Sequence, residues 1–227
     1  PNRLAELTKK HNADIGLSFD GDADRVIISD ERGEILDGSI ILAAILKFQK
    51  FGSPKKIKSI VSTYMSNLSF REFLKKSKIK LYLTNVGDRY VIEEMKKKKS
   101  ILGGEPSGHI IFSENGYCGD GILTSMHIIN IISSRKIKLS YLRNNLFKNC
   151  YQKLVNLKLK NEPEKIIMQK EFNETLNFVN KNYKEIDYLI RKSGTENLLR
   201  IMVQSKNKNH LEKVLKLVIS LIKKLDD

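Results

Sequence analysis

Three aspartates stand at alternate positions in one short stretch, and this spacing suits a metal ion. The sequence DGDADR at residues 20–25 carries Asp20, Asp22 and Asp24 directly after an apolar run. Alternate side chains of an extended, curved backbone point the same way, so the three carboxylates can converge. Carboxylates held this close repel one another unless a cation lies between them, and oxygen-only ligands select a hard ion such as Mg²⁺. The motif therefore predicts a magnesium site.

Two other interpretations of this stretch stay open. A calcium loop has some support from Glu31, eleven residues beyond Asp20. It is disfavoured because Arg25 occupies the position where a calcium loop needs glycine, and because an apolar strand follows instead of a helix. The structural alternative is an acidic turn whose aspartates only cap backbone groups.

Two further stretches combine groups that recognise hydroxyls. GGEPSGH at residues 103–109 offers backbone N–H groups together with Glu105, Ser107 and His109, a set that suits a polyol ligand. His109 could also transfer protons near neutral pH. VGDRY at residues 86–90 carries Asp88 and Arg89, which either contact a substrate or cap the helix that follows. For the first stretch, an ordinary β-turn with an exposed histidine is the alternative.

The fourth stretch, RKSGTE at residues 191–196, has the composition of an anion site. Arg191, Ser193, Gly194 and Thr195, with Arg200 shortly after, supply guanidinium groups, hydroxyls and main-chain N–H groups, for which phosphate is the natural ligand. Gly194 is the only glycine after residue 121, which predicts either a positive φ or the close approach of a ligand to the main chain. A polar hairpin loop is the alternative.

Apolar periodicity and turn residues predict the elements that position these stretches. Strands are expected over residues 14–19, 26–29, 35–36, 57–63, 79–84, 101–102, 110–112, 150–159, 186–190 and 198–204. Helices are expected over residues 4–11, 40–51, 67–77, 90–99, 119–133, 139–147, 164–181 and 210–225. This order favours an α/β class protein, a three-layer α/β unit with a largely parallel sheet followed by a C-terminal α+β domain, with the boundary near residues 134–148.

Composition narrows the class of protein. Lys and Arg total 41 against 26 Asp and Glu, a net charge of +15, but the 32 lysines are spread along the chain, so we expect a solvated surface and no nucleic-acid partner. Two distant cysteines favour a reducing, cytoplasmic compartment. No apolar run approaches the length of a membrane span, so no membrane partner is expected. Residue 1 is proline, which suggests a piece of a longer polypeptide.

The four motifs, in this order, closely resemble the α-D-phosphohexomutase superfamily, and VGDRY and RKSGTE are most similar to the bacterial phosphoglucosamine mutases. The resemblance implies a phosphoserine enzyme that interconverts glucosamine 6-phosphate and glucosamine 1-phosphate, an amino-sugar step that feeds peptidoglycan precursors. It covers only the family's C-terminal half. Residues 1–36 would end the second domain, residues 37–144 would form the third, and residues 145–227 the fourth. The family's serine-histidine-asparagine signature is absent here.

The same resemblance assigns roles to individual residues. The three aspartates would hold Mg²⁺ beside the missing phosphoserine, and Arg25 would hold the transferring phosphoryl group. Glu105 and Ser107 would bind sugar hydroxyls, with His109 near the reacting hydroxyl. The other phosphate would be held by Arg191, Ser193, Gly194 and Thr195. Pro106 and Asn197 depart from the usual family residues without replacing a ligand.

Two rival functions remain. Within the enzyme class, the chain could belong to a phosphomannomutase or phosphoglucomutase. By itself, it could be a non-catalytic phosphosugar-binding fragment that needs the N-terminal half of the same enzyme as its partner, and we expect the isolated chain to be inactive.

Overall fold

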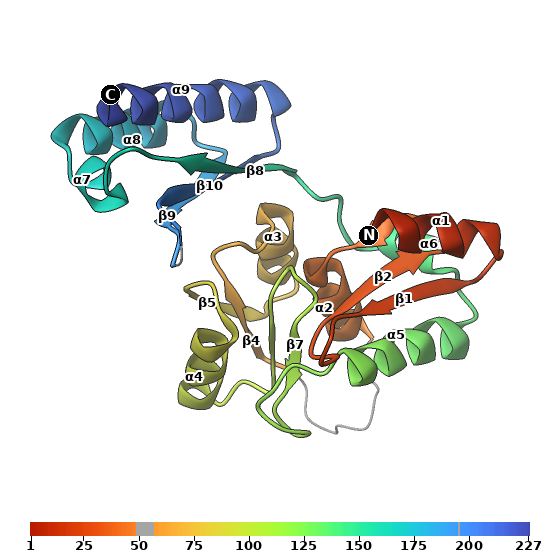
Figure 1. Ribbon diagram of the computed structural model, residues 1–227. Coiled ribbons are helices and arrows are strands. Elements are labelled where there is room, and N and C mark those ends of the chain that lie inside the picture. The colour runs from red at the N-terminus through yellow and green to blue at the C-terminus, as the bar shows by residue number, and fades with distance from the viewer. Residues whose placement is uncertain (49–56, 195) are drawn as a thin grey trace. The chain divides into compact units, whose positions relative to one another are not determined.

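The computed structural model describes residues 1–48, 57–194 and 196–227, and it divides into two units. The first unit is Pro1–Lys148 and the second is Asn149–Asp227 (Figure 1). Each unit has a hydrophobic core of its own. The expected boundary between residues 36 and 37 lies inside the first unit, and the assignment of family domains to these ranges stays a prediction.

The first unit contains two sheets and six described helices. Its strands are β1 (Ile15–Phe19), β2 (Val26–Asp30), β3 (Ile35–Leu36), β4 (Ser59–Thr63), β5 (Lys80–Thr84), β6 (Leu102–Gly104) and β7 (Ile110–Phe112). Its helices are α1 (Asn2–Lys10), α2 (Gly38–Lys47), α3 (Leu68–Lys76), α4 (Asp88–Lys98), α5 (Gly121–Arg135) and α6 (Leu139–Leu146). The first sheet, β1-β2-β3, is antiparallel. The second has the order β5-β4-β6-β7, and only β7 runs antiparallel to its neighbour. The predicted α/β class and largely parallel sheet are confirmed.

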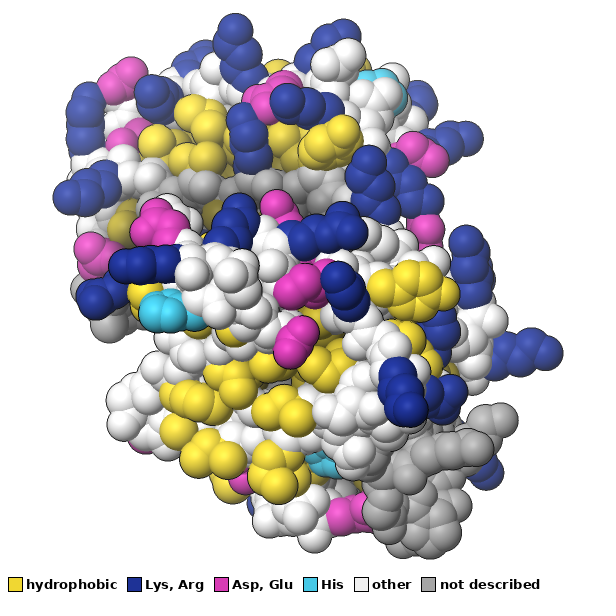
Figure 2. All heavy atoms as spheres, turned by 90° about the vertical axis from the view of Figure 1, so that its right-hand side faces the viewer, with side chains coloured by type: hydrophobic (Ala, Val, Ile, Leu, Met, Phe, Trp, Pro, Cys, Tyr) yellow, Lys and Arg dark blue, Asp and Glu magenta, His cyan; other side chains and the backbone are white. Residues whose placement is uncertain are grey.

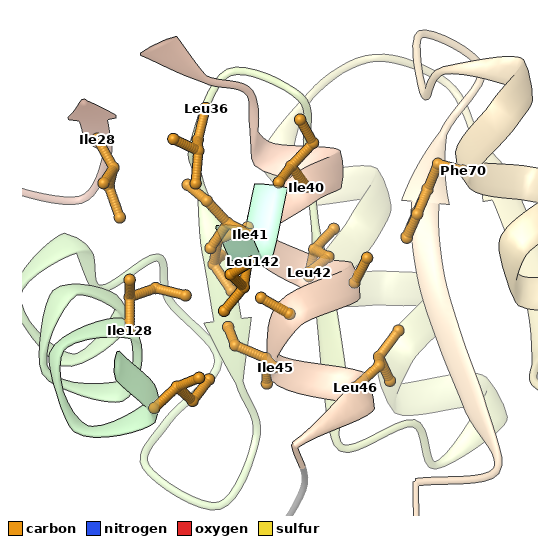
Figure 3. Packing of buried hydrophobic residues seen from close by; sticks show 14 of the residues in the cluster. Ile28, Leu36, Ile40, Ile41, Leu42, Ile45, Leu46, Phe70, Ile128 and Leu142 are labelled. Atoms are coloured by element: carbon orange, nitrogen blue, oxygen red, sulfur yellow. The ribbon is translucent and has the colours of Figure 1, made fainter. Parts of the chain in front are cut away.

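Helix α2 lies at the centre of this unit's core. Every residue from Gly38 to Leu46 is buried, as expected for a helix that is apolar on all sides. Figure 3 shows Ile41 and Ile45 on the side of α2 toward Ile128, and Leu42 and Leu46 on the side toward Phe70. The N-cap Asp37 accepts hydrogen bonds from the backbone N–H groups of residues 39 and 40. This burial fixes the start of α2, against which one of the candidate loops packs.

The second sheet places two of the candidate loops at one edge. Strands β4, β5 and β6 are parallel, so their carboxyl ends lie along the same edge of the sheet. Residues 85–87 follow β5 and residues 105–109 follow β6. Ligands of open α/β sheets bind at this carboxyl edge.

The second unit is an antiparallel sheet covered by helices. It contains β8 (Tyr151–Lys158), α7 (Pro163–Ile167), α8 (Lys170–Asn182), β9 (Ile186–Lys192), β10 (Leu198–Ser205) and α9 (Lys208–Asp226). The strand order is β8-β10-β9. Leu199, Ile201 and Val203 of β10 pack with the apolar stripe of α9, and the alternate residues of the strand belong to the other face. The expected α+β domain is confirmed.

Several elements differ from the sequence-based expectation. The helix expected over 164–181 is two helices, α7 and α8, separated at Met168 and Gln169. Gly103 and Gly104 belong to β6 instead of the loop. Asp88 and Arg89 lie in the first turn of α4, and Arg191 lies in β9. The helix expected over 40–51 ends at Lys47, and residues 49–51 of that expectation lie outside the described residues.

Strand β1 is less buried than its apolar composition suggested. Its residues are half-buried or exposed because β1 is an edge strand, paired only with β2 among the described residues. Beside it, α5 exposes Ile122, Met126 and Ile129 at helical spacing. Figure 2 shows hydrophobic side chains gathered on this face of the molecule, while Lys and Arg are dispersed. Within the described ranges, no helix has the length and apolarity that crossing a bilayer requires.

Candidate functional site

The three aspartates converge at the tip of the β1–β2 hairpin. Phe19 pairs with Val26, so residues 20–25 form the connecting loop. The backbone turns tightly there, since the N–H of Ala23 donates to the carbonyl oxygen of Asp20 at 3.2 Å and Ala23 has φ of 59°. One oxygen from each of Asp20, Asp22 and Asp24 lies within 4.8 Å of the others. The convergence expected from the alternate spacing is therefore present.

Arg25 neutralises part of this acidic cluster. Its Nε lies 2.7 Å from Oδ2 of Asp20 and donates to Oδ1 of Asp24 at 3.2 Å, while its backbone N–H donates to Oδ1 of Asp20 at 3.1 Å. Burial opposes ionisation of Asp20, but these contacts with Arg25 and a hydrogen bond with Asp24 outweigh it and lower the pKa of Asp20. The hydrogen bond with Asp24 raises the pKa of Arg25, whose side chain is 53% exposed. Asp20 and Arg25 are therefore charged at neutral pH.

The donor set fits a small divalent cation. The ligands are carboxylate oxygens only, which Mg²⁺ prefers. Oδ2 of Asp20 is buried and contacts Nε of Arg25, whereas Asp22 is exposed without a polar partner among the described residues. A cation would supply the contact that Asp22 lacks. Glu31, the extra ligand that a calcium loop would need, is instead bound to Ser140 at the start of α6, which removes the support for that alternative.

The loop is fastened to two other segments of the first unit. The N–H of Gly121, the first residue of α5, donates to the carbonyl oxygen of Ala23 at 2.9 Å. The N–H of Val26 donates to the carbonyl oxygen of Gly108 at 3.3 Å. Gly108 has φ of 91°, and a Cβ there would lie 2.1 Å from the oxygen of Val26. Only glycine allows the 105–109 loop to approach the hairpin this closely.

His109 lies against the aspartate cluster and not in solvent. Its Nδ1 is 3.1 Å from Oδ2 of Asp24, and the residue is 4% exposed. Nε2 is buried and has no hydrogen-bond partner in the described part of the chain. Gly119 packs on the ring, since a Cβ at that position would lie 2.3 Å from Cε1 of His109. The alternative of an exposed histidine in an ordinary turn is therefore wrong.

The two loops at the carboxyl edge of the second sheet are joined by Glu105. Its Oε1 accepts a hydrogen bond from the N–H of Gly87 at 3.1 Å, and its Oε2 has no partner among the described residues. Ser107 is exposed in the same loop. Asp88 accepts a hydrogen bond from its neighbour's N–H in the first turn of α4, and Arg89 pairs with Glu93 at 2.8 Å. Glu105 and Ser107 thus have free acceptors, whereas Asp88 and Arg89 are engaged within their own helix.

In the second unit, two arginines stand opposite each other on neighbouring strands. Arg191 of β9 is paired in register with Arg200 of β10, so both side chains belong to the sheet face away from α9. Nε of Arg200 is buried without a hydrogen-bond partner in the described residues. The buried, unpartnered Nε of Arg200 would suit an anion, which supports the predicted anion site.

The loop between these strands is a tight hairpin connection. The N–H of Ser193 donates to the carbonyl oxygen of Leu198 at 3.0 Å, and Ser193 is buried. Gly194 has no positive φ, so that part of the expectation is wrong; a Cβ at Gly194 would meet nothing within 4 Å, which leaves its main chain accessible. Thr195 lies outside the described residues. The structure describes the two units separately, and it does not relate residues 191–200 to the aspartate cluster.

Three glycines that matter to the site were not singled out from the sequence. Gly119 and Gly121 hold His109 and the aspartate loop, and Gly38 donates to the carbonyl oxygen of Pro106 at 2.9 Å. A Cβ at Gly38 would lie 2.1 Å from the oxygen of Glu105. The only available signal was the density of glycines at residues 116–121, and it does not say what they approach.

Two models of known protein families match this chain. A family model described as "Phosphoglucomutase/phosphomannomutase, alpha/beta/alpha domain III" matches residues 37–150, and one described as the "C-terminal domain" of the same group matches residues 154–220. The first of these alone covers half of the chain. The chain belongs to the phosphoglucomutase/phosphomannomutase family. The matches confirm the resemblance to the C-terminal half of the α-D-phosphohexomutase superfamily.

Curated members of the family give closer likenesses. The chain is 42% identical over 215 residues to the phosphoglucosamine mutase of Finegoldia magna, covering 94% of this chain and 48% of that protein. It is 40% identical over 228 residues to the phosphoglucosamine mutase of Caldanaerobacter subterraneus, covering 99% of this chain and 50% of that one. The chain therefore spans about half the length of the curated relatives it matches.

Solved structures of the phosphohexomutase superfamily share the fold. A phosphoglucomutase/phosphomannomutase family protein from Burkholderia thailandensis superposes with a TM-score of 0.79 at 19% identity, covering 98% of this chain and 49% of that one. The N-acetylphosphoglucosamine mutase of Aspergillus fumigatus, solved in complex with GlcNAc-6P and magnesium, gives a TM-score of 0.75 at 19% identity, covering 98% of this chain and 53% of that one.

Proposed function

We propose that this chain is the metal- and phosphosugar-binding half of a phosphoglucosamine mutase. The observation that carries the proposal is the convergence of Asp20, Asp22 and Asp24 within 4.8 Å of one another, at a loop held against residues 105–109. The identities of about 40% to phosphoglucosamine mutases support this choice of sugar. The activity would be the interconversion of glucosamine 6-phosphate and glucosamine 1-phosphate.

Phosphoryl transfer is catalysed mainly by positioning and by neutralisation of charge. The three aspartates would hold Mg²⁺, which when bound draws negative charge away from the oxygens of the transferring phosphoryl group. Arg25 stays cationic at neutral pH and half exposed, so its guanidinium can contact the same group. Its present contacts with Asp20 and Asp24 keep it at that position.

The sugar and the second phosphate require separate sites. Oε2 of Glu105 and the hydroxyl of Ser107 can bind sugar hydroxyls, because neither group is engaged by the described residues. In the second unit, Arg191 and Arg200, with Ser193 and the open main chain at Gly194, suit the phosphate that is not transferred. We include Thr195, Asp88 and Arg89 in the binding surface on the resemblance alone.

The phosphoryl donor is expected from the N-terminal half of the same enzyme. Members of the superfamily carry a phosphoserine there, and the signature that surrounds it does not occur in these 227 residues. The bisphosphate formed by the first transfer would have to turn end for end before the second. A binding surface built from hydroxyl and carboxylate acceptors, which do not depend on one orientation of the sugar, suits this requirement.

Two experiments test the proposal. The 227-residue chain should bind Mn²⁺ or Mg²⁺ in calorimetric titration, and it should show no mutase turnover until the N-terminal half is supplied. With both halves present, turnover should be higher on glucosamine phosphates than on mannose or glucose phosphates. Faster turnover of mannose or glucose phosphates would favour the phosphomannomutase or phosphoglucomutase assignment, for which the family description leaves room. Turnover by the chain alone would contradict the assignment of the donor.

A second candidate is a phosphosugar-binding module without catalysis, which the unengaged acceptors of Glu105 and Ser107 would also serve. Binding of glucosamine 6-phosphate to the isolated chain, without turnover in the presence of the N-terminal half, would favour this candidate.

A further inference from the structure

His109 is a buried polar side chain beside the aspartate cluster, and the proposed chemistry does not explain its contacts. It faces the aspartate cluster with Nδ1, which lies 3.1 Å from Oδ2 of Asp24. Its other nitrogen, Nε2, is buried and has no partner in the described part of the chain. At 4% exposure, His109 is almost completely buried.

The two oxygens of Asp24 are held by different groups. Oδ1 accepts a hydrogen bond from Nε of Arg25 at 3.2 Å, and Oδ2 faces Nδ1 of His109. A carboxylate is an acceptor only, so a favourable contact at 3.1 Å requires a proton on Nδ1 of His109.

Backbone pairing and close packing fix the position of His109. The backbone of residue 109 forms a β-bridge with that of Arg25. Gly119 packs on the ring, where a Cβ would lie 2.3 Å from Cε1 and 2.6 Å from Nδ1. No side chain larger than hydrogen fits at 119 while His109 keeps its position, so this glycine is part of the same arrangement.

We propose that His109 is a positioning residue for the metal centre, whose Nδ1–H orients the Asp24 carboxylate toward the cation. Gly119 makes this possible because its missing side chain leaves room for the His109 ring. The inference rests on the metal site of the proposed function. It assigns His109 a role distinct from proton transfer to the sugar. Groups that orient a metal ligand in this way commonly change metal affinity about 10–100-fold when removed.

The test replaces His109 by two amide side chains, each of which mimics one nitrogen of the imidazole ring. In His109→Asn the amide N–H lies near the position of Nδ1, whereas in His109→Gln it lies near that of Nε2. We expect Mn²⁺ affinity, measured by calorimetry and by electron paramagnetic resonance on the 227-residue chain, to fall about 10–100-fold in H109Q and to stay within about threefold in H109N. His11→Asn, the same change at an exposed position, should have no effect. Gly119→Ala should weaken Mn²⁺ binding as H109Q does.

Equal Mn²⁺ affinity in the wild-type chain and folded H109Q would overturn the inference while leaving the metal site intact. Equal loss in H109N and H109Q would also overturn it, because the contact through Nδ1 would then be irrelevant. If the wild-type chain binds no Mn²⁺, both the inference and the proposed metal role fail. Should the variants not fold, long-range ¹H–¹⁵N spectra of the wild-type imidazole still decide: a proton on Nδ1 of His109 supports the inference, and an unprotonated Nδ1 contradicts it.

Discussion

Among the three aspartates, Asp22 differs from its neighbours in having no protein partner in the described residues. Asp20 and Asp24 contact Arg25, and Asp24 also faces His109. Asp22 is exposed and contributes only negative charge to the cluster. Its one favourable role in the present geometry is therefore toward a cation.

Asp22→Asn should separate metal binding from stability. We expect affinity for Mg²⁺ or Mn²⁺ to fall about tenfold or more, because the number of charged ligands sets the affinity of such sites. The melting temperature without metal should stay the same or rise slightly, since repulsion between carboxylates is relieved. Calorimetric titration and thermal unfolding measure the two effects. Glu34→Gln removes the same charge from an exposed position outside the loop and serves as the control; an equal loss of affinity in that variant would mean that only net charge matters.

Substitution by alanine should lower the free energy of unfolding at one glycine of the candidate sites and leave it almost unchanged at another. Gly108→Ala places a methyl group 2.1 Å from the oxygen of Val26 at a φ of 91°, so the free energy of unfolding should fall by roughly 2–4 kcal/mol. Gly194→Ala enters open space without a positive φ, and we expect a change of less than about 0.5 kcal/mol. Urea denaturation of the two variants measures this difference in stability.

Phosphate affinity should nevertheless fall in G194A if ligands approach the main chain at Gly194. Unchanged phosphate binding would remove Gly194 from the anion site.

At the scale of elements, the β2–β3 turn is tied to α6 by two acidic residues, the buried Asp30 and the half-buried Glu31. Asp30 is fully buried and accepts hydrogen bonds from two backbone N–H groups of the turn and from Nε of Arg143 at 3.0 Å. Glu31 accepts hydrogen bonds from the hydroxyl and the N–H of Ser140, at the start of α6. These contacts join residues 26–36 to the last helix of the first unit.

The Glu31 contact should make stability depend on pH. Burial opposes its ionisation, but the hydrogen bonds from Ser140 outweigh that effect and lower the pKa of Glu31. A lowered folded pKa means that the stabilisation is complete above the unfolded value, near 4.3, and is lost as pH falls through the folded value. Glu31→Gln should therefore cost about 1–2 kcal/mol at pH 7 and progressively less below about pH 4. Urea denaturation from pH 3 to pH 7 measures this. A constant difference between wild type and E31Q over that range would show that ionisation of Glu31 is not involved.

Most elements of the fold could be predicted because their signals are local. Asp37 and Asn67, N-caps of α2 and α3, are the residue types that start helices, and the apolar spacing of α9 repeats over its whole length. The break between α7 and α8 could not be predicted, since neither glycine nor proline marks it and the apolar spacing continues through Ile167 and Phe172. Met168 at the break is 80% exposed, so packing of the two short helices decides it.

The candidate site likewise has features with a local sequence signal, which could be predicted, and features without one. The convergence of Asp20, Asp22 and Asp24 follows from their spacing, which is local. The contact between His109 and Asp24 joins segments far apart in the sequence, and it depends on a glycine at 119 that has no pattern of its own. Glycines 103 and 104, expected in a loop, form a strand because their missing side chains make room for Met95 and for Ile110. Such close approaches are tertiary contacts between distant segments, and they cannot be read from a single sequence.

At the scale of the whole molecule, the two units have separate hydrophobic cores. The first centres on α2, and the second lies between β10 and α9. No residue of the described part belongs to both clusters. A unit with its own core and a complete sheet has what it needs to fold alone.

We therefore expect residues 149–227, expressed alone, to fold cooperatively. Their circular dichroism should show a single urea transition whose midpoint coincides with one of the transitions of the whole chain. Matched core variants assign the transitions: Ile201→Ala should lower the free energy of unfolding of the second unit by about 2–5 kcal/mol, and Ile41→Ala should do the same only for the first, since both side chains are fully buried. A random-coil spectrum for the fragment, or an equal shift of every transition by I201A, would show that the second unit depends on the first. In that case phosphate binding at Arg191 and Arg200 would have to be studied in the whole chain, because the register that brings them together would not survive in the fragment.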